Sequence, residues 1–352
     1  MKIFIRATGN ISPQPTFGHP PLLQEPATQT GNRLRCVEPD YLNYIDAKSI
    51  RRMSRIIKMG TAAAMECLQE AGVQTPGAIV MGTAYGCLED TGIFLKKMVE
   101  QNEEMLTPTA FIQSTHNTIG AQIALLLQCH HYNNTFVHRG FSFESALLDA
   151  LMLLEENAAS TVLVGAADEI TDASHAILSR FGLYKKEVSA NTGVLASQSK
   201  GTVAGEGAAF FLLSCQASQK NYAVLDALHL FYKPAHSAEI EQQVLEFLAR
   251  QSLTPADIDL LVTGRNGDIR KDRVYEKLSD ALFKDKTTIG YKQLCGEYPT
   301  STAFALWLAA AVLKQGSLPV TLAPASATGI KRVLIYNHYE NIHHSLILVT
   351  AC

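Results

Sequence analysis

The chain has 352 residues, of which 47% are hydrophobic and 18% are charged, and its formal net charge is −3. This composition excludes an intrinsically disordered protein, and 352 residues are enough for a large core in one α/β unit or in two coupled halves. A charge so close to neutrality gives no electrostatic reason to expect nucleic acid or an anionic membrane as the main partner.

The cysteines and the apolar segments predict neither export nor membrane insertion. Seven cysteines are scattered without a Cys-x-x-Cys pair, which argues against a disulfide framework and against a structural zinc site. The longest apolar run, Ala303–Leu313, is shorter than the roughly 18 to 20 residues that a membrane span needs. The first residues alternate like a strand and lack the apolar region of a signal peptide. We therefore expect a cytoplasmic protein with reduced thiols and with no cofactor, metal or membrane span.

Short apolar and β-branched runs predict strands along the whole chain. Several of these runs do not alternate with polar residues, which is typical of strands that are buried on both faces of a sheet. From the N-terminus, the predicted strands are Ile3–Ala7, Ala78–Thr83, Thr135–His138, Thr161–Val164, Ala208–Leu213, Tyr222–Leu230, Ile258–Thr263, Arg332–Tyr336 and Ser345–Thr350.

Helical periodicity predicts helices between these strands. The segment Ser49–Ala71 has its apolar residues on one face and ends at Gly72, a typical C-terminal stop. Further helices are expected at Ile119–Leu127, Ser142–Asn157 and Thr300–Gln315. The last of these is apolar almost all round, so we expect it at the centre of the molecule.

The segment from Asn134 to Ala150 contains a predicted strand, a tight turn at Gly140 and the start of a helix near Ser142. The amino end of a helix has unpaired N–H groups and the positive end of the helix dipole, which stabilise an activated nucleophile. The segment is also compatible with an ordinary strand-to-helix junction. Because it lacks the G-x-S-x-G pattern, Ser142 is expected to cap the helix rather than to act as a nucleophile.

Three further motifs flank or follow this turn. They are Thr107-Pro-Thr-Ala-Phe-Ile-Gln-Ser-Thr-His-Asn117, Val162-Leu-Val-Gly-Ala-Ala-Asp-Glu169 and Gly201-Thr-Val-Ala-Gly-Glu-Gly-Ala-Ala209. Together with the turn, they resemble the β-ketoacyl-acyl-carrier-protein synthases over nearly the whole chain. The resemblance implies the thiolase-like α/β fold, with two βαβαβαββ-type halves packed in αβαβα layers. We expect the N-terminal half at residues 1–217 and the C-terminal half at residues 218–352.

The resemblance places a glycine where the family has its catalytic cysteine. In the family, the cysteine stands ten residues before an alanine of the following helix, and counting back from Ala150 leads to Gly140. Counts from the Gly165-Ala166 strand end and from Asn117 lead to the same residue. Phe141 is the only near alternative, and neither residue is a nucleophile.

Both histidines of the family's active site are also replaced. The K-x-x-x-G-H element reads Lys292-Gln-Leu-Cys-Gly-Glu297, so a glutamate stands in the second histidine slot. The H-G-T turn would fall in Thr263–Asp268, where Arg265 and Asn266 are the nearest polar residues. The glycine-rich turn before the last strand is replaced by Asn337–His344, which has no glycine.

These losses predict that the chain has no catalytic residues of its own. Decarboxylative condensation needs a thiolate to hold the acyl chain, and imidazoles to stabilise the enolate and the oxyanion. An ionised Glu297 would repel a developing enolate. We therefore treat Lys292, Glu297 and Arg265 as the remains of an active site and expect no independent condensing activity.

The replacements resemble those of chain-length factors and other non-catalytic ketosynthase-like subunits of type II polyketide, polyene, aryl-polyene and flexirubin pathways. Such subunits pair with an active ketosynthase, and the resemblance implies an acyl carrier protein as a second partner. It places Ala110, Phe111, Gln113 and His116 at the subunit interface near the partner's acyl tunnel. It also places Tyr85 at a position that gates the tunnel. For Tyr85 and Phe111, simple core packing is the alternative.

The leading hypothesis is a non-condensing subunit that forms a heterodimer with an active ketosynthase and shapes its acyl or polyene tunnel. The alternative is an active decarboxylase, hydrolase or acyltransferase in which Lys292, Glu297, Arg265 and His138 form a polar cluster without a covalent thioester. A third possibility is a scaffold that only binds carrier protein.

Two groups of charged or aromatic side chains are expected on the surface. Arg51, Arg52, Arg55 and Lys58 form a basic strip at the start of a predicted helix, and we interpret the strip as a solvated face, with docking of an acidic acyl carrier protein as the alternative. The pair His343-His344 lacks the spacing of a zinc site and is expected at the surface or at a dimer contact.

Overall fold

The structure is a computed structural model, and it describes residues 1–18, 22–322 and 327–352. In this part of the chain, ten strands form one mixed sheet with the order β3-β2-β4-β5-β1-β6-β10-β9-β7-β8. The strands are Ile3–Ile11 (β1), Ala78–Gly82 (β2), Tyr132–Phe136 (β3), Thr161–Asp168 (β4), Gly207–Ser214 (β5), Ala223–Tyr232 (β6), Leu260–Thr263 (β7), Thr287–Gly290 (β8), Arg332–Tyr339 (β9) and His343–Thr350 (β10).

The sheet repeats one topology on the two sides of the β1–β6 pair. On one side, β5 is antiparallel to β1 and β4, whereas β2 is parallel to β4 and β3. On the other side, β10 is antiparallel to β6 and β9, whereas β7 is parallel to β9 and β8. The antiparallel pairing of β1 with β6 joins the two sides. The predicted boundary between residues 217 and 218 falls in the loop between β5 and β6, and it stays a prediction.

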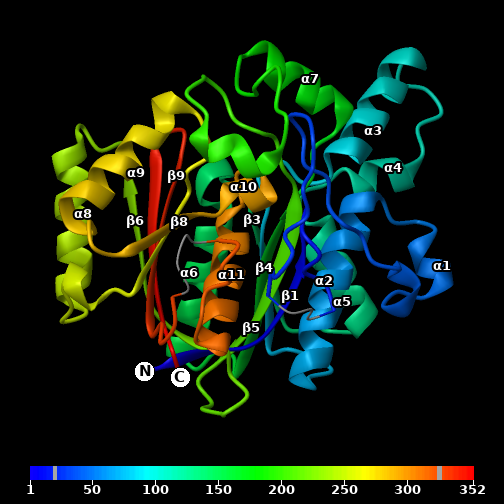
Figure 1. The fold of residues 1–352 in the computed structure, drawn as a ribbon. Coiled ribbons are helices and arrows are strands. Elements are labelled where there is room, and N and C mark those ends of the chain that lie inside the picture. The colour runs from blue at the N-terminus through cyan, green and yellow to red at the C-terminus, as the bar shows by residue number, and fades with distance from the viewer. Residues whose placement is uncertain (19–21, 323–326) are drawn as a thin grey trace.

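Helices lie on both faces of the sheet and between its two sides. The described helices are Ala47–Ile50 (α1), Arg55–Ala71 (α2), Leu88–Glu100 (α3), Pro108–Gln113 (α4), Thr118–Leu127 (α5), Ser142–Glu155 (α6), Asp172–Arg180 (α7), Ser237–Arg250 (α8), Ile269–Leu282 (α9), Lys292–Cys295 (α10) and Thr302–Gln315 (α11). Figure 1 shows α6 and α11 in the middle, between the two sides of the sheet, with α2 and α5 on one outer face and α8 and α9 on the other.

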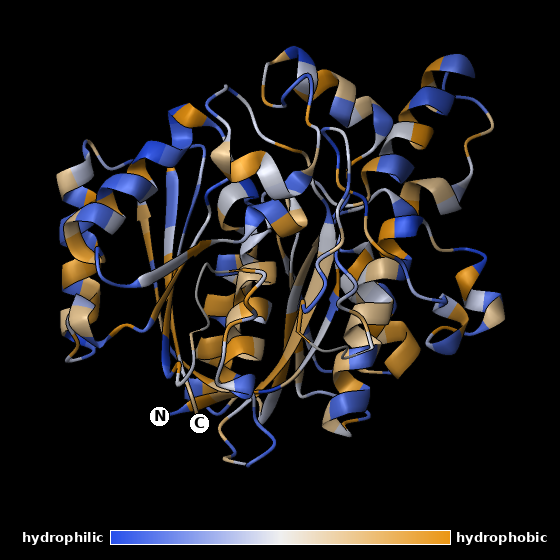
Figure 2. Cartoon of the chain, in the orientation of Figure 1, coloured by the Kyte–Doolittle hydropathy of each residue, from blue (hydrophilic) through white to orange (hydrophobic). Residues whose placement is uncertain are grey.

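Three hydrophobic clusters correspond to these helix layers. The largest surrounds α6 and α11 and takes side chains from both sides of the sheet, the second lies under α2 and α5, and the third lies under α8 and α9. Since α11 is covered on all sides, it is apolar around its circumference, as predicted for Thr300–Gln315, and Figure 2 shows most of this helix in the orange of hydrophobic residues. None of the helices in the described ranges is long and apolar enough to cross a membrane.

Several predicted boundaries were wrong; the predicted strands Ile3–Ala7 and Thr161–Val164, for example, end four residues before β1 and β4 do. The predicted helix Ser49–Ala71 is two helices, because Asp46 caps α1 and the extended backbone of Ser54 (φ −69°, ψ 170°) starts α2 at Arg55. The predicted strand Thr135–His138 is β3, which begins three residues earlier and ends at Phe136, because the chain then turns into a short 3₁₀ helix.

Several elements were not predicted. These are α3, α4, α7, α8, α9, α10 and β8. Their sequences lack the continuous apolar character of the central elements, because most of them lie at the surface and bury one face or none.

Candidate functional site

The turn before α6 is built from a 3₁₀ helix, Arg139–Phe141. Gly140 is buried at its centre, and Arg139 has a left-handed backbone (φ 55°) that L-residues other than glycine rarely adopt. The hydroxyl of Ser142 accepts a hydrogen bond from the backbone N–H of His138 at 2.8 Å. Ser142 therefore closes the 3₁₀ turn, and the prediction that it caps α6 was wrong, because it is the first residue of that helix.

No side chain fits at Gly140 in this conformation. A Cβ atom there would lie 2.9 Å from Nδ1 of His343 and 2.9 Å from both Cβ and Cδ1 of Tyr339. Carbon contacts this short do not occur in relaxed proteins. Tyr339 ends β9 and His343 begins β10, so the end of the β9–β10 hairpin fills the space above the turn.

Aromatic packing fixes the hairpin against the turn. The ring of His343 stands edge-on to Phe141, with centroids 4.8 Å apart, and to His138, with centroids 5.3 Å apart. Burial lowers the pKa of His343. His344 is 1% exposed, and burial lowers its pKa to about 4. The prediction that His343 and His344 lie at the surface was therefore wrong for His344, while His343 is half-buried.

Lys292, which is buried, and Glu297, which is partly exposed, form an ion pair beside this region. The ammonium of Lys292 lies 2.9 Å from each carboxylate oxygen of Glu297, and the amide of Asn266 donates to the same carboxylate at 2.5 Å. Lys292 is 2% exposed. Backbone hydrogen bonds from Glu297 N–H to Val203 and from Gly205 N–H to Glu297 fix the position of the glutamate. Both oxygens of Glu297 are therefore engaged by the protein itself.

The other two members of the alternative polar cluster are elsewhere. Arg265 lies 3.3 Å from the carboxylate of Glu276 and 3.9 Å from that of Asp272. His138 packs on Phe141 and His343. The structure thus brings together Lys292, Glu297 and Asn266, and it pairs Arg265 with a different set of acids.

A cavity of about 580 Å³, including its open mouth, lies next to Glu297. Four tyrosines line it, namely Tyr85, Tyr184, Tyr298 and Tyr339. Burial and a hydrogen bond with Tyr85 raise the pKa of Tyr339. The guanidinium of Arg139 lies 5.6 Å from the ring centroid of Tyr85, a cation–π contact. Tyr85 therefore lines this cavity and packs against Arg139 and Tyr339, and its role in gating a tunnel stays a prediction.

The predicted interface residues lie on an exposed arm. Ala110, Phe111 and Gln113 belong to α4, and His116 lies in the turn before α5. Phe111 is 58% exposed, which excludes the core-packing alternative for this residue. The sequence analysis missed the rest of the arm. Its exposed apolar side chains are Ile93, Leu95, Val99, Met105 and Ile112.

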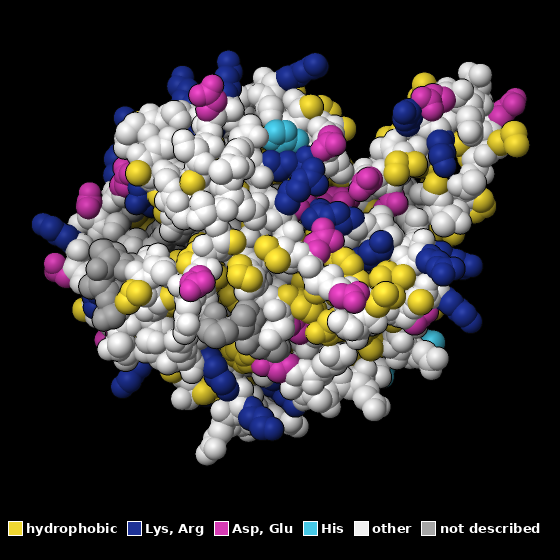
Figure 3. Space-filling view, turned by 45° about the vertical axis from the view of Figure 1, so that its right-hand side comes forward, with side chains coloured by type: hydrophobic (Ala, Val, Ile, Leu, Met, Phe, Trp, Pro, Cys, Tyr) yellow, Lys and Arg dark blue, Asp and Glu magenta, His cyan; other side chains and the backbone are white. Residues whose placement is uncertain are grey.

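The arm formed by α3 and α4 stands out from the body of the molecule. Figure 3 shows apolar side chains on this projecting lobe. A contact between the rings of Phe94 and Phe111, with centroids 5.6 Å apart, joins the two helices. Gln113 donates a hydrogen bond to the backbone carbonyl of Arg52 and so attaches α4 to the turn between α1 and α2. The arm is therefore braced, although its apolar surface is uncovered.

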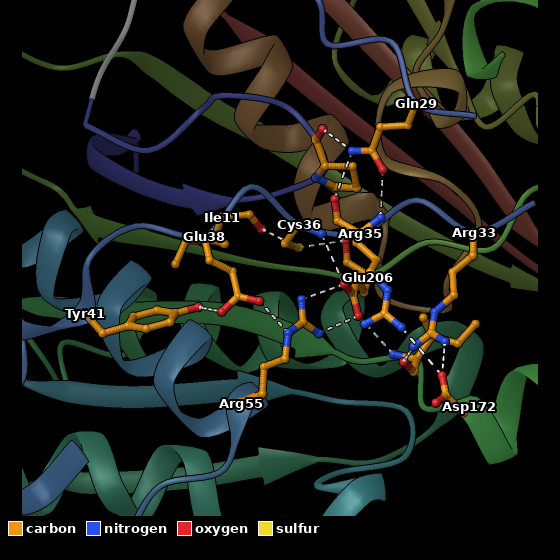
Figure 4. A network of polar contacts seen from close by, with 12 residues as sticks. Ile11, Gln29, Arg33, Arg35, Cys36, Glu38, Tyr41, Arg55, Asp172 and Glu206 are labelled. Carbon is orange, nitrogen blue, oxygen red and sulfur yellow. Dashed lines mark hydrogen bonds and ion pairs between the residues drawn. The ribbon is translucent and has the colours of Figure 1, made fainter. Parts of the chain in front are cut away.

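A buried carboxylate anchors the wall of the cavity, and the sequence analysis missed it. Glu206, with a fully buried side chain, receives two hydrogen bonds of 2.7 Å from the guanidinium of Arg55 and further ones from the backbone N–H groups of Cys36 and Ile170 (Figure 4). Arg55 also contacts Glu38. The prediction that Arg55 lies on a solvated face was wrong, because this network holds it.

No group of three or more His, Cys, Asp or Glu side chains in the described ranges is arranged to hold a metal ion.

Comparisons with known proteins identify the family. A family model described as the β-ketoacyl synthase N-terminal domain matches residues 26–243, which is more than half of the chain. The chain therefore belongs to the β-ketoacyl synthase family. A comparison with curated protein sequences gives no match.

Solved structures share the fold over the whole chain. The ishigamide ketosynthase/chain length factor matches with a TM-score of 0.82 and 15% identity, covering 100% of this chain and 99% of that one. A β-ketoacyl synthase from Burkholderia phymatum STM815 matches with a TM-score of 0.78 and 14% identity, at the same coverage. A chain of the AntDE:AntF complex, a type II acyl carrier protein with its ketosynthase, matches with a TM-score of 0.73 and 15% identity, covering 100% of this chain and 99% of that one. Identities this low show the fold alone, and the thiolase-like α/β fold class is confirmed.

Proposed function

We propose that this chain is a non-condensing ketosynthase-like subunit, a chain-length factor, that forms a heterodimer with an active β-ketoacyl-acyl-carrier-protein synthase and shapes its acyl tunnel. The observation that carries the proposal is the turn before α6, where the hairpin end occupies the space that a nucleophile would need. Neither Gly140 nor Phe141, the near alternative, can form a thioester, so the argument is the same whichever of them stands in the cysteine slot.

A nearby cysteine does not replace the missing nucleophile. Cys295 is fully buried, and its thiol faces backbone carbonyl groups, 3.3 Å from that of Gly296. Burial raises the pKa of Cys295, which keeps the thiol protonated and unreactive at neutral pH. The Lys292–Glu297 pair adds a carboxylate where the family has an imidazole, and a carboxylate disfavours the developing negative charge of an enolate.

The exposed surface supports a protein partner. The α3–α4 arm exposes apolar side chains, including Val99 (75%), Met105 (91%) and Phe111 (58%), which is unusual for a surface that remains in water. β3 is an edge strand of the sheet, and its outer side pairs with no strand in the described ranges. One structural neighbour is named as a ketosynthase/chain length factor, and another contains a ketosynthase with its acyl carrier protein. An active ketosynthase as stable partner and an acyl carrier protein as transient partner fit these features.

The pathway follows from the same proposal. A subunit of this kind acts in polyketide or fatty-acid-like biosynthesis, with aryl-polyene and flexirubin-type pathways as specific candidates, and it works in the cytoplasm. Ala110, Phe111, Gln113 and His116 would face the partner's tunnel, whereas Tyr85 closes the tunnel of this subunit. We also propose residues 1–217 and 218–352 as the two thiolase-like halves.

The proposal can be tested by reconstitution. The chain would be co-expressed with each ketosynthase encoded near its own gene, and condensation of malonyl-acyl-carrier-protein and product length would be measured by mass spectrometry. We expect no condensation by this chain alone, and condensation by one partner that depends on its presence. If the chain stays apart from every candidate and no candidate's activity changes, the proposal is wrong.

A further inference from the structure

A second groove lies between α8 and α9, on the other side of the β9–β10 turn. It encloses about 600 Å³, including its open side. Adjacent residues of the turn line the two cavities, because Glu340 borders the vestigial site and Asn341 borders this groove. The residues that line the groove are separate from Lys292, Glu297 and Gly140, so the groove requires its own explanation.

The groove is positively charged because basic side chains of α9 line it, whereas acidic side chains of this helix face away from it. Arg270, Arg273 and Lys277, with the spacing i, i+3 and i+7, line the groove. Asp272 and Glu276 lie on another side of the helix, where they face Arg265. None of the described residues that line the groove is acidic.

Two of the three cations have no ionic partner among the described residues. Arg270 is paired with Asp268 through contacts of 2.6 and 3.0 Å. Arg273 and Lys277 are exposed and form no ion pair with any residue in the described ranges. Two unpaired cations one turn apart on a helix repel each other mildly, and an anion bound between them would relieve this.

The facing wall of the groove favours an anion as well. Ser237, the first residue of the 14-residue helix α8, lines the groove beside the N-cap residue His236, so the positive end of this helix dipole is directed toward it. The ring of His236 accepts a hydrogen bond from the backbone N–H of Glu239 at 3.2 Å, and the N–H groups of Ser237 and Ala238 are the ones left for an anion. The acid of this first turn, Glu239, accepts a hydrogen bond from the backbone N–H of Ala235.

A buried histidine forms part of the same wall. His344 is 1% exposed and lines the groove, and within the described ranges its Nε2 atom has no hydrogen bond of ordinary geometry, although the backbone of Asn341 is close enough to raise the pKa of His344 against the effect of burial. Its Nδ1 atom lies 3.0 Å from the hydroxyl of Tyr336. In the tautomer in which Nδ1 accepts from this hydroxyl, Nε2 carries a proton that it can donate.

We propose that this groove binds the phosphate monoester group of a small organic ligand. Arg273 and Lys277 would hold the phosphate from one side and the amino end of α8 from the other. Pro234, Ile240 and Val274 form the apolar part of the lining and would contact the carbon skeleton of the ligand. The proposal does not depend on the role of the chain as a ketosynthase partner.

Phenyl phosphate is a suitable probe, because it combines a phosphate monoester with a small apolar group. We expect saturable binding to the full chain in isothermal titration calorimetry. In the double variant R273Q/K277Q, the affinity should fall by about tenfold or more, because both unpaired cations are lost. The matched control K186Q/K284Q removes two exposed lysines elsewhere and should bind within about twofold of the wild type.

A second variant tests the groove from the α8 side. S237E places a carboxylate at the amino end of α8, which stabilises the helix but occupies the anion site, so binding should also fall by about tenfold. If phenyl phosphate does not saturate the chain by about 20 mM, or if S237E and R273Q/K277Q bind it as tightly as the wild type, the proposal is overturned. Should the double variant lose its fold, the result with S237E decides.

Discussion

At Gly140, the addition of a single Cβ atom would produce a steric clash. Its neighbours are the backbone-anchored Cβ of Tyr339 and the ring of His343, which is packed against Phe141. Neither neighbour is the free end of a flexible side chain. Any larger residue at position 140 therefore has to displace the hairpin end.

We predict that Gly140→Cys does not create a condensing enzyme. The new side chain should destabilise the fold by about 1 to 3 kcal/mol through overpacking, and its thiol should react slowly with iodoacetamide. Urea unfolding and the rate of alkylation, followed by mass spectrometry, would check this. Gly193→Cys is the control, since a Cβ at Gly193 meets no atom within 4 Å. A fully stable Gly140→Cys protein that accepts an acyl group from acyl carrier protein would contradict the prediction.

Glu297 provides a second test, because the alternative enzyme hypothesis needs it as a catalytic group. Glu297→Gln leaves the ammonium of Lys292 buried without a counter-charge, so we expect a loss of about 3 kcal/mol in the free energy of unfolding. The double variant Lys292→Met/Glu297→Leu should recover most of this loss, because it removes both charges together.

The same variant separates a structural from a chemical role. The wild-type chain, incubated alone with malonyl-acyl-carrier-protein, should release no carbon dioxide above background, and Glu297→Gln should behave identically. Release by the wild type that disappears in a folded Glu297→Gln protein would support the alternative decarboxylase.

The α3–α4 arm is the element for which we expect the largest effect on assembly. Phe111 and Ile112 are 58% and 62% exposed on α4. We predict that Phe111→Ser/Ile112→Ser weakens binding to the ketosynthase partner by about 2 kcal/mol or more, because aromatic and aliphatic anchors carry most of the energy of an interface. The melting temperature should fall only slightly, since both side chains are mostly in water in the free chain and the contact of Phe111 with Phe94 is the packing that is lost. Size-exclusion chromatography and calorimetric titration of the mixed subunits would measure the change.

Ile177→Ser/Phe181→Ser provides the matched control for the arm. These residues are 54% and 76% exposed at α7 and just after it. The control should bind the partner like the wild type. Equal losses in both double variants would mean that the effect comes from general surface hydrophobicity and not from the arm.

The elements of the core could be predicted from the sequence, and those of the surface mostly could not. Apolar runs such as Thr161–Val164 and Thr300–Gln315 predict buried elements without further information. The structure places them in the core as β4 and α11. Helices α8 and α9 bury one face only, and their mixed composition hid them.

At the candidate site, the resemblance to the family's K-x-x-x-G-H element pointed to Lys292 and Glu297, which the structure brings into contact. It could not reveal that Tyr339 and His343 fill the space at Gly140, nor that Arg55 reaches Glu206, because these contacts join segments more than 150 residues apart. A long-range contact of this kind leaves no periodic signal in the sequence.

The two sides of the sheet are held together at the centre as well as at the β1–β6 edge. Glu144 of α6 is fully buried and accepts a hydrogen bond of 3.1 Å from the hydroxyl of Ser345 in β10. This bond crosses between the two repeated halves of the topology. Burial raises the pKa of Glu144 to about 7, and it also raises the pKa values of Glu66 and Glu169 to about 7.

These raised values set the direction of the pH dependence. A carboxyl whose folded-state pKa lies above its unfolded value binds its proton more tightly in the folded protein. Its contribution to stability is fully present below the unfolded pKa, about 4.5, and is lost as the pH rises through the folded pKa, about 7. For Glu144 alone, this shift corresponds to about 3 kcal/mol. We therefore expect the free energy of unfolding to fall between about pH 5 and pH 7.

Glu144→Gln should remove the share of this pH dependence that belongs to Glu144. The amide keeps an oxygen that can accept from Ser345 but never ionises, so the variant should be more stable than the wild type by about 1 to 3 kcal/mol at pH 8 and nearly equal to it at pH 5. Urea unfolding at both pH values measures this difference. Glu155→Gln, on the exposed end of the same helix, is the control and should leave the pH profile unchanged. A Glu144→Gln protein that loses stability equally at pH 5 and pH 8 would contradict the prediction. Glu144 would then be an ionised hydrogen-bond acceptor in the folded protein at both pH values.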